Sequence, residues 1–411
     1  MKAWATDKLG SLCLKVSSGG TPLRSVPEYY ENGTIPWMKT GEVKKSVIYD
    51  TEEKITEAGL ENSSAKLVPA NSVIVAMYGD GDTAGNVAIN KVPLTTNQAC
   101  CNFTLDPDKA HYRFIYFYLK GSYNNLVNLK LGGSQQNLNS RSLKNFPITH
   151  PEVEVQRKIA AILSAYDDLI ENNQRRIALL EKMAEEIYRE WFVRLRFPGH
   201  NKLKLVKGVP QGWRLSCLGN VAKFTMGQSP SSEFYNEVGN GLPFHQGVGT
   251  YGERFPRTIT YCSEDGRRAH KGDILFSVRA PVGRLNIADR EMIIGRGLAA
   301  LRHKKEYNSY LYYLLKTAFA NEDIIGNGSI FNSVGKDELA KFPIFEPESS
   351  LVERFDAIAS KMDEQITVLI HATECLKSSR DALLPRLISG KLSVENLDIQ
   401  CPLGMEASAY A

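Results

Sequence analysis

Several short strings in the sequence contain residue types that could bind a cofactor or perform a reaction. Residues 247–252 (GVGTYG) match the G-x-G-x-x-G string of dinucleotide-binding proteins, but residues 253–256 (ERFP) follow where that motif requires a helix. Residues 42–44 (EVK) have the acidic-x-lysine spacing of some nucleases, without an obvious upstream acidic partner for a metal. Residues 79–82 (GDGD) lie between two strand-like runs, which favours a turn. None of these strings has the context that its chemistry needs.

Other catalytic signals are missing from the sequence. It has no G-x-x-x-x-G-K-[ST] loop for ATP, and residues 106–108 (DPD) are the nearest approach to the Asn-Pro-Pro-aromatic string of adenine methyltransferases. The seven histidines form no H-E-x-x-H and are expected on the surface or in loops. The seven cysteines form no C-x-x-C and are expected to be reduced core thiols, with Cys100 and Cys101 on opposite faces of a strand. We therefore expect no catalytic site, metal or cofactor in this chain.

Polar and basic side chains in Gly- and Ser-rich loops are the better functional candidates. Arg and Lys suit phosphates or guanine edges, Asn and Gln suit adenine edges, and Ser and Thr can serve either. The candidate DNA contacts in residues 1–150 are Thr21, Arg24, Lys39, Thr40, Gln135, Gln136 and Asn137. Those in residues 199–346 are Gln228, Ser229, His245, Gln246, Arg254, Arg279, Arg284 and Asn332. The alternative for each is a solvated loop residue without a base contact.

The distribution of charge also points to these two regions. Lys and Arg number 16 against 13 Asp and Glu in residues 1–150, and 20 against 14 in residues 199–346. The other regions are slightly acidic, with 8 against 9 in residues 151–198 and 6 against 10 in residues 347–411. A polyanionic partner for the two basic regions fits this pattern. No window offers the roughly 18 apolar residues without charge that a membrane span needs, so we expect a cytoplasmic protein.

The elements that must position these side chains follow an internal repeat. Corresponding segments of the two halves share polar loops, an apolar strand-like run and an aromatic-rich helix. They are, in order, residues 20–22 and 228–230, 35–37 and 242–244, 72–76 and 273–277, 112–120 and 308–316, and 133–137 and 328–332. The match is strict at the end of each half, where residues 146–148 (FPI) recur 196 residues later as 342–344. Pro151 and Pro347 follow, each well placed to start a helix.

Each proline precedes a long heptad pattern, which predicts a coiled-coil seam. The first seam is Ile159, Leu163, Tyr166, Ile170, Asn173, Ile177, Leu180, Ala184, Ile187 and Trp191. The second, 196 residues later, is Phe355, Ala359, Met362, Ile366, Leu369, Thr373, Leu376, Arg380, Leu383 and Leu387. Two seams of equal length most simply bury each other, with the polar members helping to fix register. The alternative is that each helix packs only on its own globular neighbour.

Residues 194–199 are expected to end the first helix, and Gly390 to end the second. The resulting division is a first domain at 1–150, a helix at 151–198, a linker and second domain at 199–346, a helix at 347–392 and a tail at 393–411. The tail has no periodicity and is expected to be disordered.

At these helices the chain resembles the specificity subunits of type I restriction-modification enzymes. Residues 163–173 (LSAYDDLIENN) and 190–193 (EWFV) resemble the central repeat of that family, and residues 384–392 (LPRLISGKL) its C-terminal repeat. The resemblance implies an α+β protein with two mixed target-recognition domains, separated by two helices that pair as an antiparallel coiled coil about a pseudo-twofold axis.

The resemblance also implies partners. These are double-stranded DNA, two methyltransferase subunits docked on the helices and two ATP-driven restriction subunits, with S-adenosylmethionine, ATP and Mg held by the partner subunits. A helix of about 40 residues is about 60 Å long, comparable with the spacing of DNA half-sites, so the expected target is two short unlike sequences separated by a fixed gap. The rival hypotheses are a stand-alone methyltransferase or nuclease with a degenerate motif, and a coiled-coil adaptor that binds protein or RNA.

Overall fold

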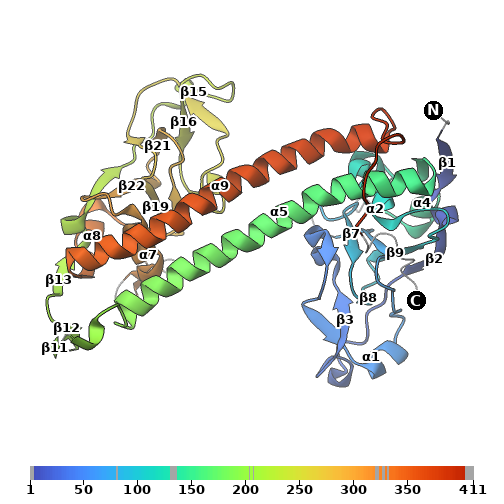
Figure 1. The fold of residues 1–411 in the computed structure, drawn as a ribbon, viewed down its shortest axis with the longest axis horizontal. Helices are drawn as coiled ribbons and strands as arrows, with labels where there is room; N and C mark the ends of the chain where they lie inside the picture. Colours follow the sequence, from blue (N-terminus) through green and yellow to red (C-terminus); the bar gives the residue numbers. More distant parts are fainter. Residues whose placement is uncertain are drawn as a thin grey trace. The chain divides into compact units, whose positions relative to one another are not determined.

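The computed structural model describes residues 4–79, 82–129, 137–202, 204–206, 208–319, 324–325, 329–330 and 333–402. The chain divides into two compact units: unit 1 is residues 1–172 with 372–411, and unit 2 is residues 173–371. The longest helices, α5 (Val153–Tyr188) and α9 (Ser349–Ile388), each contribute to both units, because the division falls inside them (Figure 1).

Unit 1 contains ten strands and four short helices among its described residues, besides its shares of the long helices. The strands are β1 (Ala5–Lys8), β2 (Cys13–Ser18), β3 (Ile35–Met38), β4 (Val47–Ile48), β5 (Glu53–Ile55), β6 (Val73–Ala76), β7 (Val87–Asn90), β8 (Thr95–Thr96), β9 (Cys100–Leu105) and β10 (Pro147–His150). The helices are α1 (Glu57–Glu61), α2 (Tyr112–Gly121), α3 (Tyr123–Val127) and α4 (Ser140–Lys144). A 3-10 helix, η3, covers Thr40–Lys45.

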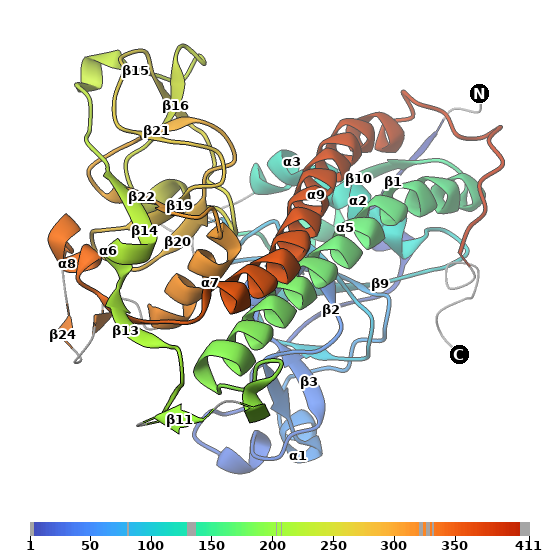
Figure 2. The ribbon, with the colours of Figure 1, turned by 60° about the vertical axis from the view of Figure 1, so that its left-hand side comes forward.

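The strands of unit 1 form a large sheet in the order β2-β9-β6-β7-β4 and a small sheet in the order β5-β3-β8. The strands β1 and β10 form a separate pair (Figure 2). Both faces of β6 are covered: Val73 and Val75 join a core with the aromatic helix α2, and Ile74 and Ala76 join a second core that includes Met38 of the small sheet. Two-sided burial explains why this strand is a continuous apolar run.

Unit 2 contains fifteen strands and three short helices among its described residues, besides its shares of the long helices. Its strands are β11 (Leu205–Val206), β12 (Val209–Pro210), β13 (Arg214–Cys217), β14 (Ala222–Met226), β15 (Tyr235–Asn236), β16 (Leu242–His245), β17 (Thr260–Cys262), β18 (Arg268–Ala269), β19 (Ile274–Ser277), β20 (Leu285–Ile287), β21 (Met292–Ile294), β22 (Leu298–His303), β23 (Ile324–Ile325), β24 (Ser329–Ile330) and β25 (Pro343–Glu346). Its short helices are α6 (Leu218–Val221), α7 (Asn308–Ala318) and α8 (Lys336–Ala340).

The connections of unit 2 repeat those of unit 1. The order β14-β22-β19-β20 matches β2-β9-β6-β7, and the end pair β13-β25 matches β1-β10. In the small sheets, β16 pairs antiparallel with β17 and parallel with β21, as β3 pairs with β5 and β8. The strands and helices predicted at residues 72–76, 112–120, 273–277 and 308–316 are therefore present, in matching topological positions.

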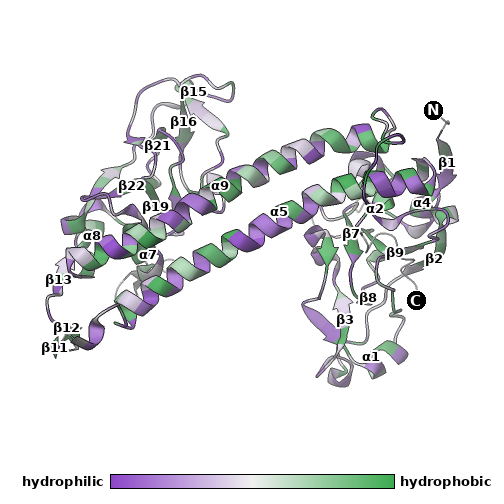
Figure 3. Ribbon diagram, in the orientation of Figure 1, coloured by the Kyte–Doolittle hydropathy of each residue, from purple (hydrophilic) through white to green (hydrophobic). Residues whose placement is uncertain are grey.

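Both long helices alternate between hydrophobic and hydrophilic residues along their length (Figure 3). None of the twenty seam candidates is exposed. In unit 2, Ile177 of α5 packs with Ile366 and Leu369 of α9, and Tyr188 contacts Phe355 with ring centroids 5.6 Å apart. In unit 1, Leu163 shares a core with Leu384 and Leu387, and Arg380 pairs with Asp167. Within each unit, residues later in α5 therefore contact residues earlier in α9.

The ends of the long helices follow the sequence signals. After α5 the chain makes a π-helical turn, Arg189–Val193, and Leu195 then adopts a φ of 60°. Beyond α9, Gly390 has a φ of 72°, a left-handed conformation that favours glycine. Among the helices that the structure describes, none combines the length and apolar character that a membrane span requires.

Two expectations are wrong. Disorder is wrong for residues 393–399 of the tail: Val394 is buried in the unit 1 core, Ile399 packs against that core, and the Lys158 ammonium donates to the carbonyls of Glu395 and Leu397, each at 2.9 Å. Residues 403–411 of the tail lie outside the described residues. A segment without periodicity can still be ordered when one apolar side chain is buried and the backbone carbonyls of the segment accept hydrogen bonds. The expectation of surface or loop positions is wrong for three histidines that are buried within strands, namely His150, His245 and His303, whereas the buried His111 does lie in the loop before α2.

The cysteines are free thiols, as expected. Cys100 and Cys101 lie on β9 and enter different cores, so they do face opposite sides of the strand. Cys375 is exposed on α9, which corrects the expectation that all seven are core residues.

Candidate nucleic-acid interface

The polar loop before each small sheet is held in the same way in both units. In unit 1 the amide of Gly20 donates to the carbonyl of Thr96 at 2.8 Å; in unit 2 the amide of Gln228 donates to that of Ile294 at 3.0 Å. The hydroxyl of Tyr30 donates to the Pro22 carbonyl at 2.6 Å, and that of Tyr235 donates to the Pro230 carbonyl at 2.9 Å. Thr21 and Ser229 therefore occupy corresponding positions.

The parallel strand pairs extend this correspondence. Trp37 lies opposite Thr95 and Phe244 opposite Ile293, so the residues after these strands also correspond. We define corner 1 as Thr21, Lys39 and Gln98, and corner 2 as their counterparts Ser229, Gln246 and Arg296.

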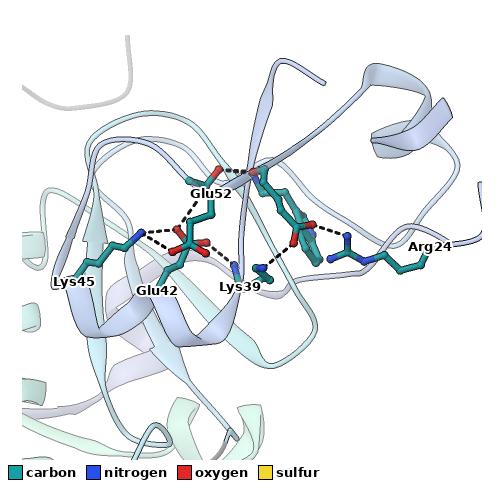
Figure 4. A network of polar contacts seen from close by, with 8 residues as sticks. Arg24, Lys39, Glu42, Lys45 and Glu52 are labelled. Atoms are coloured by element: carbon teal, nitrogen blue, oxygen red, sulfur yellow. Dashed lines mark hydrogen bonds and ion pairs between the residues drawn. The ribbon is translucent and has the colours of Figure 1, made fainter. Parts of the chain in front are cut away.

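Lys39 of corner 1 belongs to a network of charged groups (Figure 4). The Glu53 carboxylate binds the Arg24 guanidinium and accepts a bond from the Lys39 ammonium at 2.7 Å. The hydrogen bond from Arg24 and then the one from Lys39 lower the pKa of Glu53, and the bond to Glu53 raises the pKa of Lys39. Arg24 also lies over the rings of Tyr30 and Trp37, 4.5 and 4.7 Å from their centroids. Both predicted cations are thus held in place while half-exposed.

Hydrogen bonds order the rest of corner 1. The Thr21 hydroxyl donates to the Oε1 atom of the exposed Gln98 side chain. Thr40 is buried, and its hydroxyl donates to Asn97 Oδ1 at 2.9 Å. Thr40 is therefore wrong as a direct DNA contact, because its hydroxyl is used to support the neighbouring loop. The nuclease-like string at 42–44 lies in η3, where buried Glu42 accepts bonds from the Lys39 amide and the Lys45 ammonium.

Corner 2 is built mainly from neutral groups. The Ser229 hydroxyl donates to Gln246 Oε1 at 2.8 Å and accepts the amide hydrogen of Arg296 at 3.2 Å. Gln228, Gln246 and the Arg296 side chain are exposed.

Two of the predicted contacts in unit 2 are wrong because they are buried. His245 is fully buried, with Nδ1 2.9 Å from the Thr250 hydroxyl, and burial lowers its pKa to about 4. The Arg254 side chain is 1% exposed and binds the carboxylates of Glu181 on α5 and Asp363 on α9. Burial alone would lower the pKa of Arg254, but the Asp363 charge keeps it above its usual value. Arg254 attaches the loop at residues 253–256 to both long helices.

The remaining candidates stay predictions. Arg279 and Arg284 are exposed beyond β19, where the Arg279 backbone bridges to Ser333 and the Arg284 amide donates to the Ser277 hydroxyl at 2.8 Å. Asn137 is half-buried. Gln135, Gln136 and Asn332 lie outside the described residues.

Sequence reasoning missed Gln98, Arg296 and the positioning carboxylate Glu53. The available signal for Arg296 was the string at 295–297 (GRG), where glycine on both sides lets the chain pass close to another strand. Gln98 and Glu53 can be identified only from the pairing of the strands, which the sequence does not show. No group of three or more metal-ligating side chains gathers in the described part of the chain.

Comparison with known proteins assigns this arrangement to a class. The model of the type I restriction modification DNA specificity domain matches residues 1–182 and 210–363. The putative type I restriction enzyme MjaX specificity subunit of Methanocaldococcus jannaschii is 31% identical over 71% of this chain and 69% of its own length. The MjaIX specificity subunit of the same organism is 28% identical over 96% of this chain and 95% of its own.

A solved structure supports the fold. The type I restriction-modification S subunit from M. genitalium aligns with a TM-score of 0.63 at 19% identity, covering 93% of this chain and 96% of that one. These matches define a DNA-recognition subunit of mixed helix and sheet with two domains. The chain belongs to the type I restriction-modification DNA specificity family, and its role is DNA recognition without catalysis.

Proposed function

We propose that this chain recognises a DNA site split into two short, unlike half-sites, one read by the domain at residues 1–150 and the other by the domain within residues 199–346. The observation that carries this proposal is the pair of corners: corresponding backbone positions carry different polar side chains, Thr21, Lys39 and Gln98 against Ser229, Gln246 and Arg296. Equivalent positions with different donors and acceptors suit different base pairs.

The long helices, in this proposal, pair as an antiparallel coiled coil about a pseudo-twofold axis and set the gap between the half-sites. The opposed order of α5 and α9 contacts within each unit, the burial of the seam and the repeated strand order support it. Helices of 36 and 40 residues extend roughly 54 and 60 Å at about 1.5 Å per residue. That length is comparable with half-sites one to two DNA turns apart.

The proposed partners are double-stranded DNA, two methyltransferase subunits and two restriction subunits. The relatives from M. jannaschii are named as type I restriction enzyme specificity subunits, which is the reason for proposing the same assembly. S-adenosylmethionine, ATP and Mg would then be bound by the partner subunits. With double-stranded DNA as its proposed substrate, the complex would act in the cytoplasm.

Domain exchange tests the proposal. The chain would be expressed with its methyltransferase subunit, and modified adenines in the host genome would be sequenced. Replacing residues 1–150 with the corresponding domain of a relative should change one half-site and leave the other half and the gap unaltered. A change in both halves, or a site that is not split, would contradict independent reading.

A further inference from the structure

Corner 2 contains Arg296, whose backbone packs closely against Gln246. A Cβ added to Gly295 would lie 2.6 Å from Gln246 Oε1, and one added to Gly297 would lie 2.6 Å from the Gln246 carbonyl oxygen. Only glycine permits this approach to the end of β16. The Arg296 amide donates to the Ser229 hydroxyl, so Gln246 and Ser229 together hold this backbone.

The side chain of Arg296 leaves this fixed backbone toward solvent. It is exposed, and within the part of the chain that the structure describes its guanidinium makes no hydrogen bond or ion pair, although its charge acts on Tyr235. Two other arginines of unit 2 differ in this respect: Arg268 binds Asp265 and Glu291, and Arg302 binds Asp273. Arg296 is therefore free to present its planar donors to an external acceptor pair.

Corner 1 presents an amide at the corresponding place. Asn97 Oδ1 accepts from the Ala99 amide at 3.2 Å and from Thr40, which orders the turn before β9. The Gln98 side chain is exposed, and the bond from Thr21 fixes its Oε1 end. Its Nε2 has no partner among the described residues. The amide thus offers one donor and one further acceptor site together.

The two side chains match different bases. Guanidinium donates two parallel hydrogen bonds to O6 and N7 of guanine, whereas a glutamine amide both donates to N7 and accepts from N6 of adenine. We propose that Gln98 and Arg296 are specificity-determining residues, with Arg296 reading a guanine in one half-site and Gln98 an adenine in the other. This inference rests on the proposed function and names the residues that would carry it.

The test uses the full chain assembled with its methyltransferase subunit. Arg296→Gln should reduce methylation of the cognate site about tenfold or more and relax one base position of a single half-site. Gln98→Glu, which replaces the donor with an acceptor, should relax one position in the other half-site. Each variant leaves the opposite half-site unchanged.

A matched control separates reading from simple charge. Arg267 is exposed in the same unit, its carbonyl accepts the Ile294 amide at 2.8 Å, and Arg267→Gln removes the same charge nearby. It should weaken binding equally on cognate and scrambled DNA. The inference is overturned if Arg296→Gln behaves like Arg267→Gln. It is also overturned if the Arg296 and Gln98 variants assemble, methylate as much DNA as the wild type and recognise both half-sites unchanged. If the unmutated complex instead methylates a site that is not split, the proposed function itself is overturned. The two failures are therefore distinguishable.

Discussion

Corner 1 of unit 1 is stabilised by charge, whereas corner 2 of unit 2 is stabilised by neutral hydrogen bonds and close backbone packing. Glu53 lies opposite Trp37 and binds two cations, but Thr260, its counterpart opposite Phe244, carries no charge. In the same way Lys39 is replaced by Gln246. Backbone hydrogen bonds from the preceding loop are nevertheless equivalent in both units. The comparison teaches that this fold fixes where a side chain is presented, while its chemistry varies independently.

The largest expected effect concerns attachment to the helices. Arg254→Ala should lower the free energy of unfolding by about 3–5 kcal/mol, because it breaks a buried ion pair and leaves Glu181 and Asp363 without their partner. Chemical denaturation would measure the loss. Arg214→Ala is the control: Arg214 is 73% exposed, and removal of its pair with Glu346 should leave stability unchanged. Equal effects of the two variants would contradict the anchoring role.

A smaller effect is expected at the glycine packing of corner 2. Gly297→Ala introduces a Cβ 2.6 Å from the Gln246 carbonyl, so it should cost roughly 1–3 kcal/mol and disturb reading of one half-site. Nothing lies within 4 Å of a Cβ added at Gly249, so Gly249→Ala provides the control. Denaturation and sequencing of methylated sites would be compared. Identical behaviour of the two variants would show that the close approach is unimportant.

Acidification should destabilise unit 2 through its buried histidines. Burial lowers the pKa of His245 and of His303 from 6.5 to about 4, so the unfolded chain takes up protons first as the pH falls. Stability is then lost between about pH 6.5 and 4, on the order of 1 kcal/mol per histidine by pH 5.5. His245→Gln should flatten the dependence in denaturation curves at pH 7 and 5.5. An unchanged slope would argue against a neutral buried His245.

The smallest effect tests the charge network of corner 1. Glu53→Gln releases Arg24 and Lys39, so discrimination at the half-site of unit 1 should fall severalfold while the salt dependence of DNA binding steepens. Glu52→Gln makes the same change in charge and removes the pair with Lys45, but it leaves the bonds from Arg24 and Lys39 to Glu53 in place. DNA binding at several salt concentrations, on cognate and scrambled duplexes, compares the two. Loss of discrimination in both would show that net charge, and not positioning, is responsible.

Periodicity and repetition were sufficient to predict the principal elements. Residues 273–277 were predicted as a strand because the run has an apolar centre, Ile274–Phe276, and heptads after Pro151 and Pro347 predicted α5 and α9. Such signals are local, since residue type and spacing determine which face of a strand or helix can be buried. The tail was mispredicted because its order depends on Lys158, far away in the sequence.

Whether one polar side chain faces solvent was decided only by the tertiary structure. Arg254 and Arg296 look equally suited to DNA in a glycine-punctuated loop, yet Arg254 is buried because carboxylates from two distant helices surround it. Arg296 is exposed because two glycines hold its backbone against Gln246. The amino-acid sequence alone determined the family, the repeat and the helices, because those depend on local pattern. The identity of the exposed corner residues depends on contacts between residues far apart in the chain, which pattern does not encode.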